Sequence, residues 1–317
     1  MRTRTVFAAV LAAAATVTLS ACGQEQTTAG PATATGGKPT VCLIMKSLAN
    51  EYFQQMQTGA KAHVDQLGTL SLQAAGIQNE TDVDGQIALV DKCITQGVQA
   101  IVIAPADSKA LVQSVVKADK AGIKVVNIDV ALDPDALKAA GVEVPLVGPD
   151  NRAGAKQVGD VLAKAVGPAG KVVILEGNPG ADNALQRKNG FNDTIAESKL
   201  NLLDSKTAHW ETDEAYTVFG NMLTAHPDIQ GVMASNDSMA LGAIKVIQER
   251  KAAVKVVTID NIPAVKPYLQ SGPVLATLDQ FGSEQAGDGI DVAMKLIGGQ
   301  SVTGWQKTRM TVVTAGS

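Results

Sequence analysis

The sequence predicts an α/β protein with two similar lobes, each built on a doubly wound parallel sheet. Short β-branched runs alternate along the chain with helix-patterned segments, which is the signature of βαβ units. The apolar runs are nearly continuous, as expected for strands that are covered on both faces. The same rhythm restarts in the second half of the chain, which favours two similar lobes over one large sheet.

The first half of the chain predicts four strands separated by helices. One helix opens at Asp82, whose carboxylate suits an N-cap position. The expected strands are Val41–Met45, Leu70–Ala74, Ala100–Ile103 and Lys124–Ile128. The expected helices are Tyr52–Leu67, Asp82–Gln96 and Ser108–Ala121.

The second half repeats this pattern. Its expected helices are Asn151–Val166, Ala181–Glu197, Thr212–Ala225 and Ser238–Glu249. Its expected strands are Lys171–Glu176, Leu202–Thr207, Gly231–Ala234 and Val256–Ile259. Ligands of doubly wound sheets bind beyond the carboxyl ends of the strands, so residues just after each strand matter most for function. These residues are Lys46, Ala104, Asp129, Asn178, Asn236, Asp260 and Gln280.

The N-terminus has the pattern of a processing signal. Positive charges at Arg2 and Arg4 precede an apolar, alanine-rich run that is short for a membrane span. The run ends in Leu19-Ser20-Ala21-Cys22, which resembles the lipobox of bacterial lipoproteins. We therefore expect a signal peptide over residues 1–21 and lipidation of Cys22; a plain secretory signal is the alternative. Residues 22–37, rich in Gln, Thr, Ala, Gly and Pro, are expected to form a flexible tether.

Composition excludes several function classes. The chain has 317 residues, 45% of them hydrophobic, which is enough for two lobes of ordinary size. A net charge of −4 without a Lys/Arg-rich run argues against nucleic-acid binding. The sequence lacks G-x-S-x-G, H-E-x-x-H and C-x-x-C motifs, and no pair of its three histidines has metal-ligand spacing. We expect a protein that is not an enzyme and that uses no cofactor or metal.

Motifs along the whole chain resemble the ribose- and allose-binding members of the type I periplasmic binding proteins. The first motif, Lys46-Ser47-Leu48-Ala49-Asn50-Glu51-Tyr52-Phe53, follows the first strand and opens the first helix. Later motifs include Asn127-Ile128-Asp129, Arg187-Lys188-Asn189-Gly190-Phe191, Asn236-Asp237-Ser238-Met239-Ala240-Leu241-Gly242 and Ala276-Thr277-Leu278-Asp279-Gln280. The resemblance implies two lobes joined by a three-segment hinge.

The resemblance also implies a set of sugar-binding residues. Carboxylates, arginine and amides pair with sugar hydroxyls, and aromatic rings cover the C–H faces of a sugar. The implied residues are Asn50, Tyr52, Phe53 and Asp129 from the first lobe and Arg187, Trp210, Asn236, Asp260 and Gln280 from the second. Plainer alternatives exist: Phe53 as core packing, Asn236 as a helix cap, Trp210 as a surface aromatic and Arg187 as the partner of a surface carboxylate.

Departures from the ribose pattern favour a hexose or polyol over ribose. Lys46 and Ala104 resemble the allose type, as does the inserted segment Asp133–Gly141. Lys46 is therefore counted among the ligand-binding residues. Alternatively, it pairs with Asp129 or Asp260 and does not meet the ligand.

The resemblance implies a monomeric, extracytoplasmic lipoprotein that delivers a monosaccharide to an ABC-type permease. The chain is expected to cross between lobes near 148–150, 280–281 and 309–310. Lobe one would comprise 38–148 and 281–309, and lobe two 149–280 and 310–317. The alternative function is a receptor lipoprotein that passes a sugar or furanosyl signal to a sensor kinase. A LacI-type repressor would need a DNA-binding segment before Val41, where the tether lies.

Cys42 and Cys93 are a candidate disulfide. If the first sheet has the order 2-1-3, the helix containing Cys93 crosses over the first strand and ends near Cys42. An even pair of cysteines in an oxidising compartment is able to form a disulfide. Two separately buried thiols are the alternative.

Overall fold

A computed structural model describes residues 37–316. Within it, a compact unit begins at Lys38. The expected signal peptide 1–21, the expected lipidation residue Cys22 and the tether up to residue 36 lie outside the described residues. None of the helices in the described part of the chain combines the length and the apolar character needed to span a bilayer.

The first lobe contains a six-stranded parallel sheet in the order β11-β5-β4-β3-β1-β2. Its strands are β1 (Thr40–Ser47), β2 (Ser71–Ile77), β3 (Ala100–Ile103), β4 (Lys124–Ile128), β5 (Leu146–Gly148) and β11 (Trp305–Lys307). The expected order 2-1-3 is present. β5 and β11 were not predicted, because each has only three residues and β11 is exposed along its whole length.

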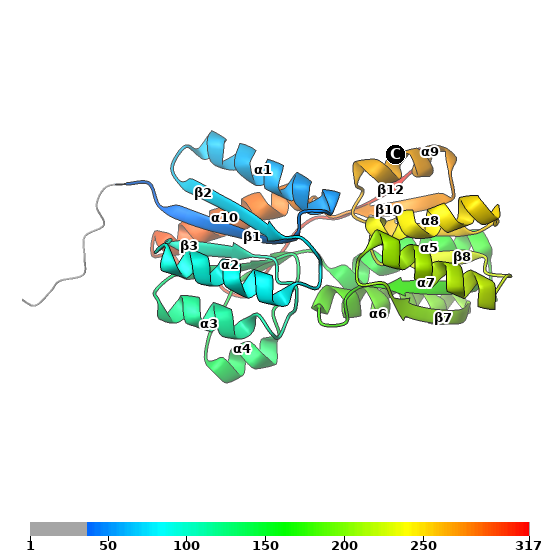
Figure 1. Ribbon diagram of the computed structural model, residues 1–317, viewed down its shortest axis with the longest axis horizontal. Coiled ribbons are helices and arrows are strands. Elements are labelled where there is room, and N and C mark those ends of the chain that lie inside the picture. The colour runs from blue at the N-terminus through cyan, green and yellow to red at the C-terminus, as the bar shows by residue number, and fades with distance from the viewer. Residues whose placement is uncertain (1–36, 317) are drawn as a thin grey trace, which may run out of the picture. The chain divides into compact units, whose positions relative to one another are not determined.

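Helices cover both faces of this sheet (Figure 1). They are α1 (Glu51–Leu67), α2 (Val83–Thr95), α3 (Val112–Lys120), α4 (Pro134–Ala140) and α10 (Gly282–Ile297). Alternate residues of β1 face opposite sides, as the strand period requires. Leu43 packs in the core cluster that contains α1 and α10, whereas Ile44 packs in the cluster that contains α2 and α3. This two-sided burial explains why β1 is apolar without interruption.

The second lobe repeats the arrangement with the order β12-β10-β9-β8-β6-β7. Its strands are β6 (Lys171–Glu176), β7 (Asn201–Thr207), β8 (Gly231–Ala234), β9 (Lys255–Ile259), β10 (Val274–Asp279) and β12 (Thr311–Thr314). The edge strand β12 runs antiparallel to β10, so this sheet is parallel except at one edge. β10 and β12 were not among the predicted strands.

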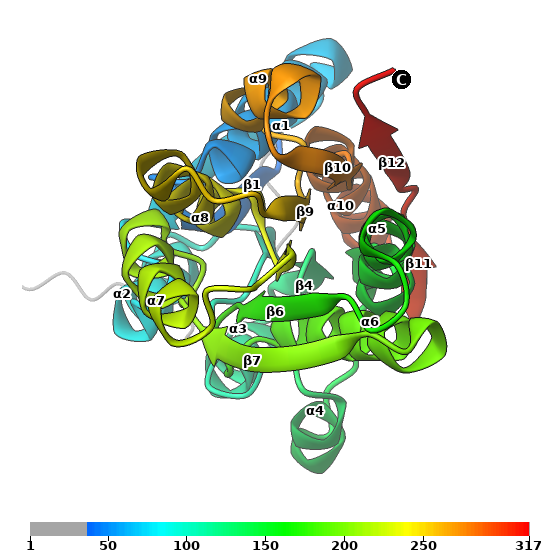
Figure 2. The same ribbon diagram turned by 90° about the vertical axis from the view of Figure 1, so that its right-hand side faces the viewer.

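The helices of the second lobe also lie on two faces (Figure 2). They are α5 (Asn151–Val166), α6 (Asp182–Ser198), α7 (Thr212–Ala225), α8 (Asp237–Arg250) and the short pair η1 (Pro263–Val265) and α9 (Lys266–Ser271). α5 packs against α6, and α7 packs against α8. The structure therefore confirms two α/β lobes with sheets that are parallel or nearly so.

The chain passes between the two sheets three times, after β5, after β10 and between β11 and β12. These segments contact one another. The backbone carbonyl of Gly148 accepts hydrogen bonds from Thr308 N at 3.1 Å and from Trp305 Nε1 at 2.8 Å. The Arg309 guanidinium lies 3.3 Å from the centroid of the Phe281 ring. The three crossings thus form one strip between the lobes.

Cys42 on β1 and Cys93 on α2 form a disulfide, and their Cα atoms are 6.3 Å apart. Both side chains are buried in the cluster between the sheet and helices α2 and α3. Of the two alternatives that the sequence left open, the structure has the disulfide.

Candidate functional site

A pocket between the lobes gathers all ten residues that the sequence indicated as ligand-binding. They enter it from the carboxyl ends of strands and from the first two turns of helices, as expected for doubly wound sheets. The lining residues are Lys46, Asn50, Tyr52, Phe53, Glu80, Asp129, Asn183, Arg187, Trp210, Asn236, Asp260 and Gln280. Glu80 and Asn183 were not predicted.

The start of α1 positions three of these side chains. Asn50 is the N-cap: its Oδ1 accepts a hydrogen bond from Tyr52 N at 3.0 Å, and its Nδ2 donates to Glu80 Oε1 at 3.3 Å. The rings of Tyr52 and Phe53 pack edge to face with centroids 5.1 Å apart. Phe53 belongs to the core cluster and lines the pocket as well, so core packing and a place in the pocket do not exclude each other.

Lys46 pairs with Glu80, and the expected alternative of a pair with Asp129 or Asp260 is wrong. Lys46 Nζ lies 3.0 Å from Glu80 Oε2, and the side chains are 3% and 2% exposed. The ammonium also lies 4.9 Å from the centroid of the Trp210 ring. Burial raises the pKa of the Glu80 carboxyl, and the neighbouring Lys46 ammonium opposes that shift. Glu80 was missed because it lies in a loop beyond β2 that carries no periodic pattern.

Asp129 follows β4 at the pocket wall. Its backbone adopts φ 64°, a left-handed conformation that aspartate tolerates better than most residues. Its Oδ1 accepts a hydrogen bond from the Tyr52 hydroxyl at 3.4 Å. Burial raises the pKa of Asp129, while Lys46 and Arg187 lower it. The carboxylate is thus held within a site that also holds two cations.

Arg187 on α6 is fixed by buried partners, so the alternative of a surface ion pair is wrong. Its Nε donates to Asn151 Oδ1 at 2.8 Å, its Nη1 to the carbonyl of Ser235 at 2.8 Å and its Nη2 to Gln280 Oε1 at 2.9 Å. The guanidinium also lies 3.8 Å from Asp260 Oδ1. These contacts hold the planar guanidinium of Arg187 in one orientation in the pocket wall.

Asp260 and Gln280 complete the second lobe's polar wall. Gln280 Nε2 donates to Asp260 Oδ1 at 2.6 Å. Burial raises the pKa of Asp260 well above its ordinary value; Arg187 opposes this, whereas Asp237 and Asp129 reinforce it. Asp237 lies outside the pocket lining and accepts hydrogen bonds from Ile262 N and the Thr277 hydroxyl, at 2.8 and 3.0 Å.

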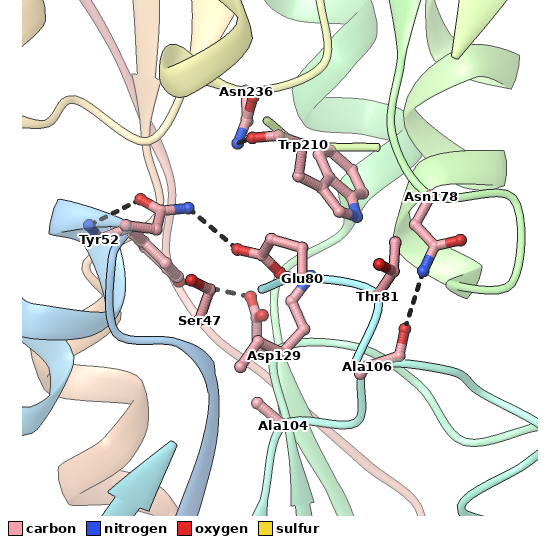
Figure 3. A network of polar contacts seen from close by, with 12 residues as sticks. Ser47, Tyr52, Glu80, Thr81, Ala104, Ala106, Asp129, Asn178, Trp210 and Asn236 are labelled. Carbon is pink, nitrogen blue, oxygen red and sulfur yellow. Dashed lines mark hydrogen bonds and ion pairs between the residues drawn. The ribbon is translucent and has the colours of Figure 1, made fainter. Parts of the chain in front are cut away.

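Trp210 and Asn236 close the pocket from above in Figure 3. Trp210 is 3% exposed, so its reading as a surface aromatic is wrong. Its indole packs so closely on Gly177 that a Cβ there would lie 2.1 Å from the ring. Asn236 caps α8, because its Oδ1 accepts from Met239 N at 2.9 Å, and it also donates to the Trp210 carbonyl at 3.4 Å. Asn236 therefore both caps α8 and lines the pocket.

Asn183 is the second residue of α6 and lies one helical turn before Arg187. Residues four apart share a helix face, so both side chains point to the pocket. The sequence offered one signal that would have found Asn183, namely its spacing from Arg187. That spacing alone is a weak signal, because asparagine is also favoured near a helix start as a cap.

The pocket is suited to binding rather than to catalysis. Carboxylates, amides and cations converge with three aromatic rings on an enclosed space, which matches the donor, acceptor and C–H surfaces of a polyhydroxylated molecule. Fold and site together define a two-lobed protein that encloses a small solute.

Comparison with known proteins specifies this class. A family model described as the periplasmic binding protein domain matches residues 41–301. The D-ribose/D-allose-binding protein of Pseudomonas aeruginosa is 46% identical over 290 residues, which cover 90% of this chain and 91% of that protein. The ribose import binding protein of Salmonella typhimurium is 34% identical, covering 84% and 87%.

A solved structure agrees with these relatives. A periplasmic solute-binding protein of an ABC transporter from Actinobacillus succinogenes, with bound D-allose, has a TM-score of 0.83 and 37% identity. The match covers 88% of this chain and 98% of that one. The chain belongs to the type I periplasmic sugar-binding proteins. Its relatives are binding proteins for transport, and the expectation that it is not an enzyme is confirmed by them.

Proposed function

We propose that the protein captures an allose-like monosaccharide between its lobes and delivers it to an ABC-type importer. The observation that carries this proposal is the enclosed pocket, to which both lobes contribute charged, amide and aromatic side chains. Two of the relatives support the choice of sugar: one is named for D-ribose and D-allose, and the other was solved with D-allose bound.

The Lys46–Glu80 pair favours a hexose over ribose. The pair adds a cation and an anion to the first lobe's side of the pocket, next to the Trp210 ring. Groups that are both buried and charged form strong hydrogen bonds to hydroxyls. A larger sugar with an additional hydroxyl group offers such partners. Pentoses and polyols remain the competing ligands in the same proposal.

Contacts between the lobes support capture by closure about the three crossings. Ser108 N donates to the Gly180 carbonyl at 2.9 Å, and Asp182 N donates to Ser108 Oγ at 2.8 Å. Asn178 Nδ2 also reaches the Ala106 carbonyl at 3.4 Å (Figure 3). A ligand that touches both lobes binds the closed state more strongly, so it shifts the population toward closure.

The family supports delivery to a transporter, and the N-terminal sequence supports lipid anchoring. The family is extracytoplasmic and works with ABC transporters. We propose lipidation at Cys22, a tether over residues 22–37 and a monomeric binding unit. The proposed lobe limits are 38–148 with 281–309 and 149–280 with 310–317. The same closure would serve a receptor that acts on a sensor kinase. The class of ligand that binds distinguishes transport from this receptor role.

A thermal-shift screen tests the proposal. A soluble form beginning at Gln24, stripped of bound sugar, is heated with D-allose, D-ribose, other hexoses, polyols and furanosides. A ligand that binds only the folded state raises the Tm by mass action. We expect the largest rise with D-allose. No shift with any monosaccharide would contradict sugar capture, and a shift with furanosides alone would favour the receptor role.

A further inference from the structure

Two polar atoms of the described pocket wall, the acceptor Asn183 Oδ1 and the donor Trp210 Nε1, have neither a hydrogen-bond nor an ion-pair partner. Among the described residues, three pocket residues have a buried side-chain atom without a hydrogen bond: Glu80 Oε2, Asn183 Oδ1 and Trp210 Nε1. Glu80 Oε2 nevertheless lies 3.0 Å from the Lys46 ammonium, which compensates its charge. Asn183 Oδ1 has no such neighbour, although the residue is only 3% exposed.

An unsatisfied amide oxygen at this depth is costly. Buried polar atoms in folded proteins almost always have a hydrogen-bond partner, and each exception needs an explanation. An acceptor that is buried without a donor loses its hydrogen bonds to water, and no protein hydrogen bond offsets the free-energy cost. Helix capping does not explain the asparagine, because the N-cap of α6 is Ala181 and no side chain caps this helix.

The backbone around Asn183 is held against the other lobe. Its neighbour Asp182 donates through its backbone N to Ser108 Oγ, and Ser108 N donates to the Gly180 carbonyl. One turn along α6, Arg187 is fixed by three hydrogen bonds. Asn183 is therefore positioned from both sides while its amide oxygen stays free to accept.

We propose that Asn183 is a specificity-determining residue whose Oδ1 accepts a hydrogen bond from one hydroxyl of the bound sugar. The inference rests on the proposed sugar-binding function. It deepens that function, because a site built to bond one hydroxyl rejects a ligand that lacks it. The deoxy analogue that lacks this hydroxyl leaves the oxygen unpaired, as it is without a ligand.

The experiment is a cycle of protein variants and sugar analogues. Calorimetry measures the affinity of wild-type protein and Asn183→Ala for D-allose and for its set of monodeoxy derivatives. We expect Asn183→Ala to weaken D-allose binding by about tenfold, as the loss of one buried hydrogen bond implies. One deoxy derivative should bind the two proteins equally well, and the others should lose the same factor as D-allose.

Folding of the variant is checked separately. Asn183→Ala removes an unsatisfied acceptor, so its Tm without sugar should not fall below that of the wild type. Asn183→Ser, which keeps a shorter hydroxyl acceptor, provides a second variant if alanine prevents folding. It should show the same dependence on a single hydroxyl, with a smaller loss.

Asn178→Ala is the matched control. Asn178 is another asparagine between the lobes, but it bonds the Ala106 carbonyl and does not line the pocket. Its loss should weaken all analogues by one common factor. The proposal is overturned if Asn183→Ala behaves in this uniform way or leaves D-allose affinity unchanged. If the wild type binds none of the sugars, the proposed function fails, and the inference fails with it.

Discussion

Lys46 Nζ and Glu80 Oε2 form an ion pair at 3.0 Å inside the wall of the sugar pocket. Both residues belong to the first lobe, since Lys46 is the penultimate residue of β1 and Glu80 follows β2. Asn50 Nδ2 bonds the second Glu80 oxygen. Both partners of the pair thus come from one lobe, and the backbone N of Glu80 also donates to Glu211 Oε1 of the second lobe at 3.0 Å.

Removing one partner of this pair should destabilise the fold. Glu80→Ala leaves the Lys46 ammonium buried without its counter-charge, and breaking a buried pair in this way costs about 3 kcal/mol. We expect a loss of that order in the free energy of urea-induced unfolding. The double variant Lys46→Met with Glu80→Leu is the control, because it removes both charges and keeps the volume. It should unfold near the wild-type midpoint while binding D-allose weakly. Equal destabilisation in both variants would show that packing, not charge, explains the loss.

Asp129 should be required for sugar affinity. Asp129→Asn keeps the shape of the side chain but removes the charge that strengthens its hydrogen bonds. We expect affinity for D-allose, measured by calorimetry, to fall by about tenfold or more. Asp150→Asn is the matched control: Asp150 caps α5 and pairs with Lys307 near the crossings. An asparagine still caps there, so affinity should stay unchanged. Equal affinity of wild type and Asp129→Asn would remove Asp129 from the site.

Asp237 should make stability depend on pH. Burial raises the pKa of this carboxyl from 3.8 to about 7 in the folded protein. Between these values the folded state binds a proton that the unfolded state has lost. The free energy of unfolding therefore falls as pH rises through this window, by at most about 1.4 kcal/mol per pH unit for one group. We expect Asp237→Asn to reduce the fall between pH 4 and pH 7. Urea unfolding at several pH values measures it, and identical pH dependence in both proteins would contradict the assignment.

The sequence was most informative where periodicity and burial agree. β1 is apolar at every central position because helices cover both faces, and that pattern was visible without coordinates. β11, the sequence Trp-Gln-Lys, is exposed at all three residues and is specified by pairing with β5 instead of by composition. Edge pairing is a tertiary contact, so such a strand is not readable from local propensity.

The site residues likewise divide into those that local sequence patterns predict and those that depend on tertiary contacts. Asn50 lies at an expected helix start, Asp260 follows an expected strand and Arg187 lies in a motif on an expected helix, and the structure brings all three together. Glu80 was missed because nothing in its loop indicates that it faces Lys46. The partner of Lys46 depends on how the loop after β2 folds back beside β1. Sequence spacing constrains such a contact only weakly.

The Cys42–Cys93 disulfide should stabilise the fold. The bond closes a loop between residues 51 positions apart, and constraint of the unfolded chain by a loop of this length contributes about 4 kcal/mol. The double variant Cys42→Ala with Cys93→Ala should lose stability of that order in urea unfolding. Addition of a reductant should lower the unfolding midpoint of the wild type and leave that of the variant unchanged.

A soluble form beginning at Gln24 contains no cysteine other than Cys42 and Cys93. Thiol titration of that form, denatured without reductant, should therefore detect no free thiol. Two free thiols would show that the bond does not form in the purified protein.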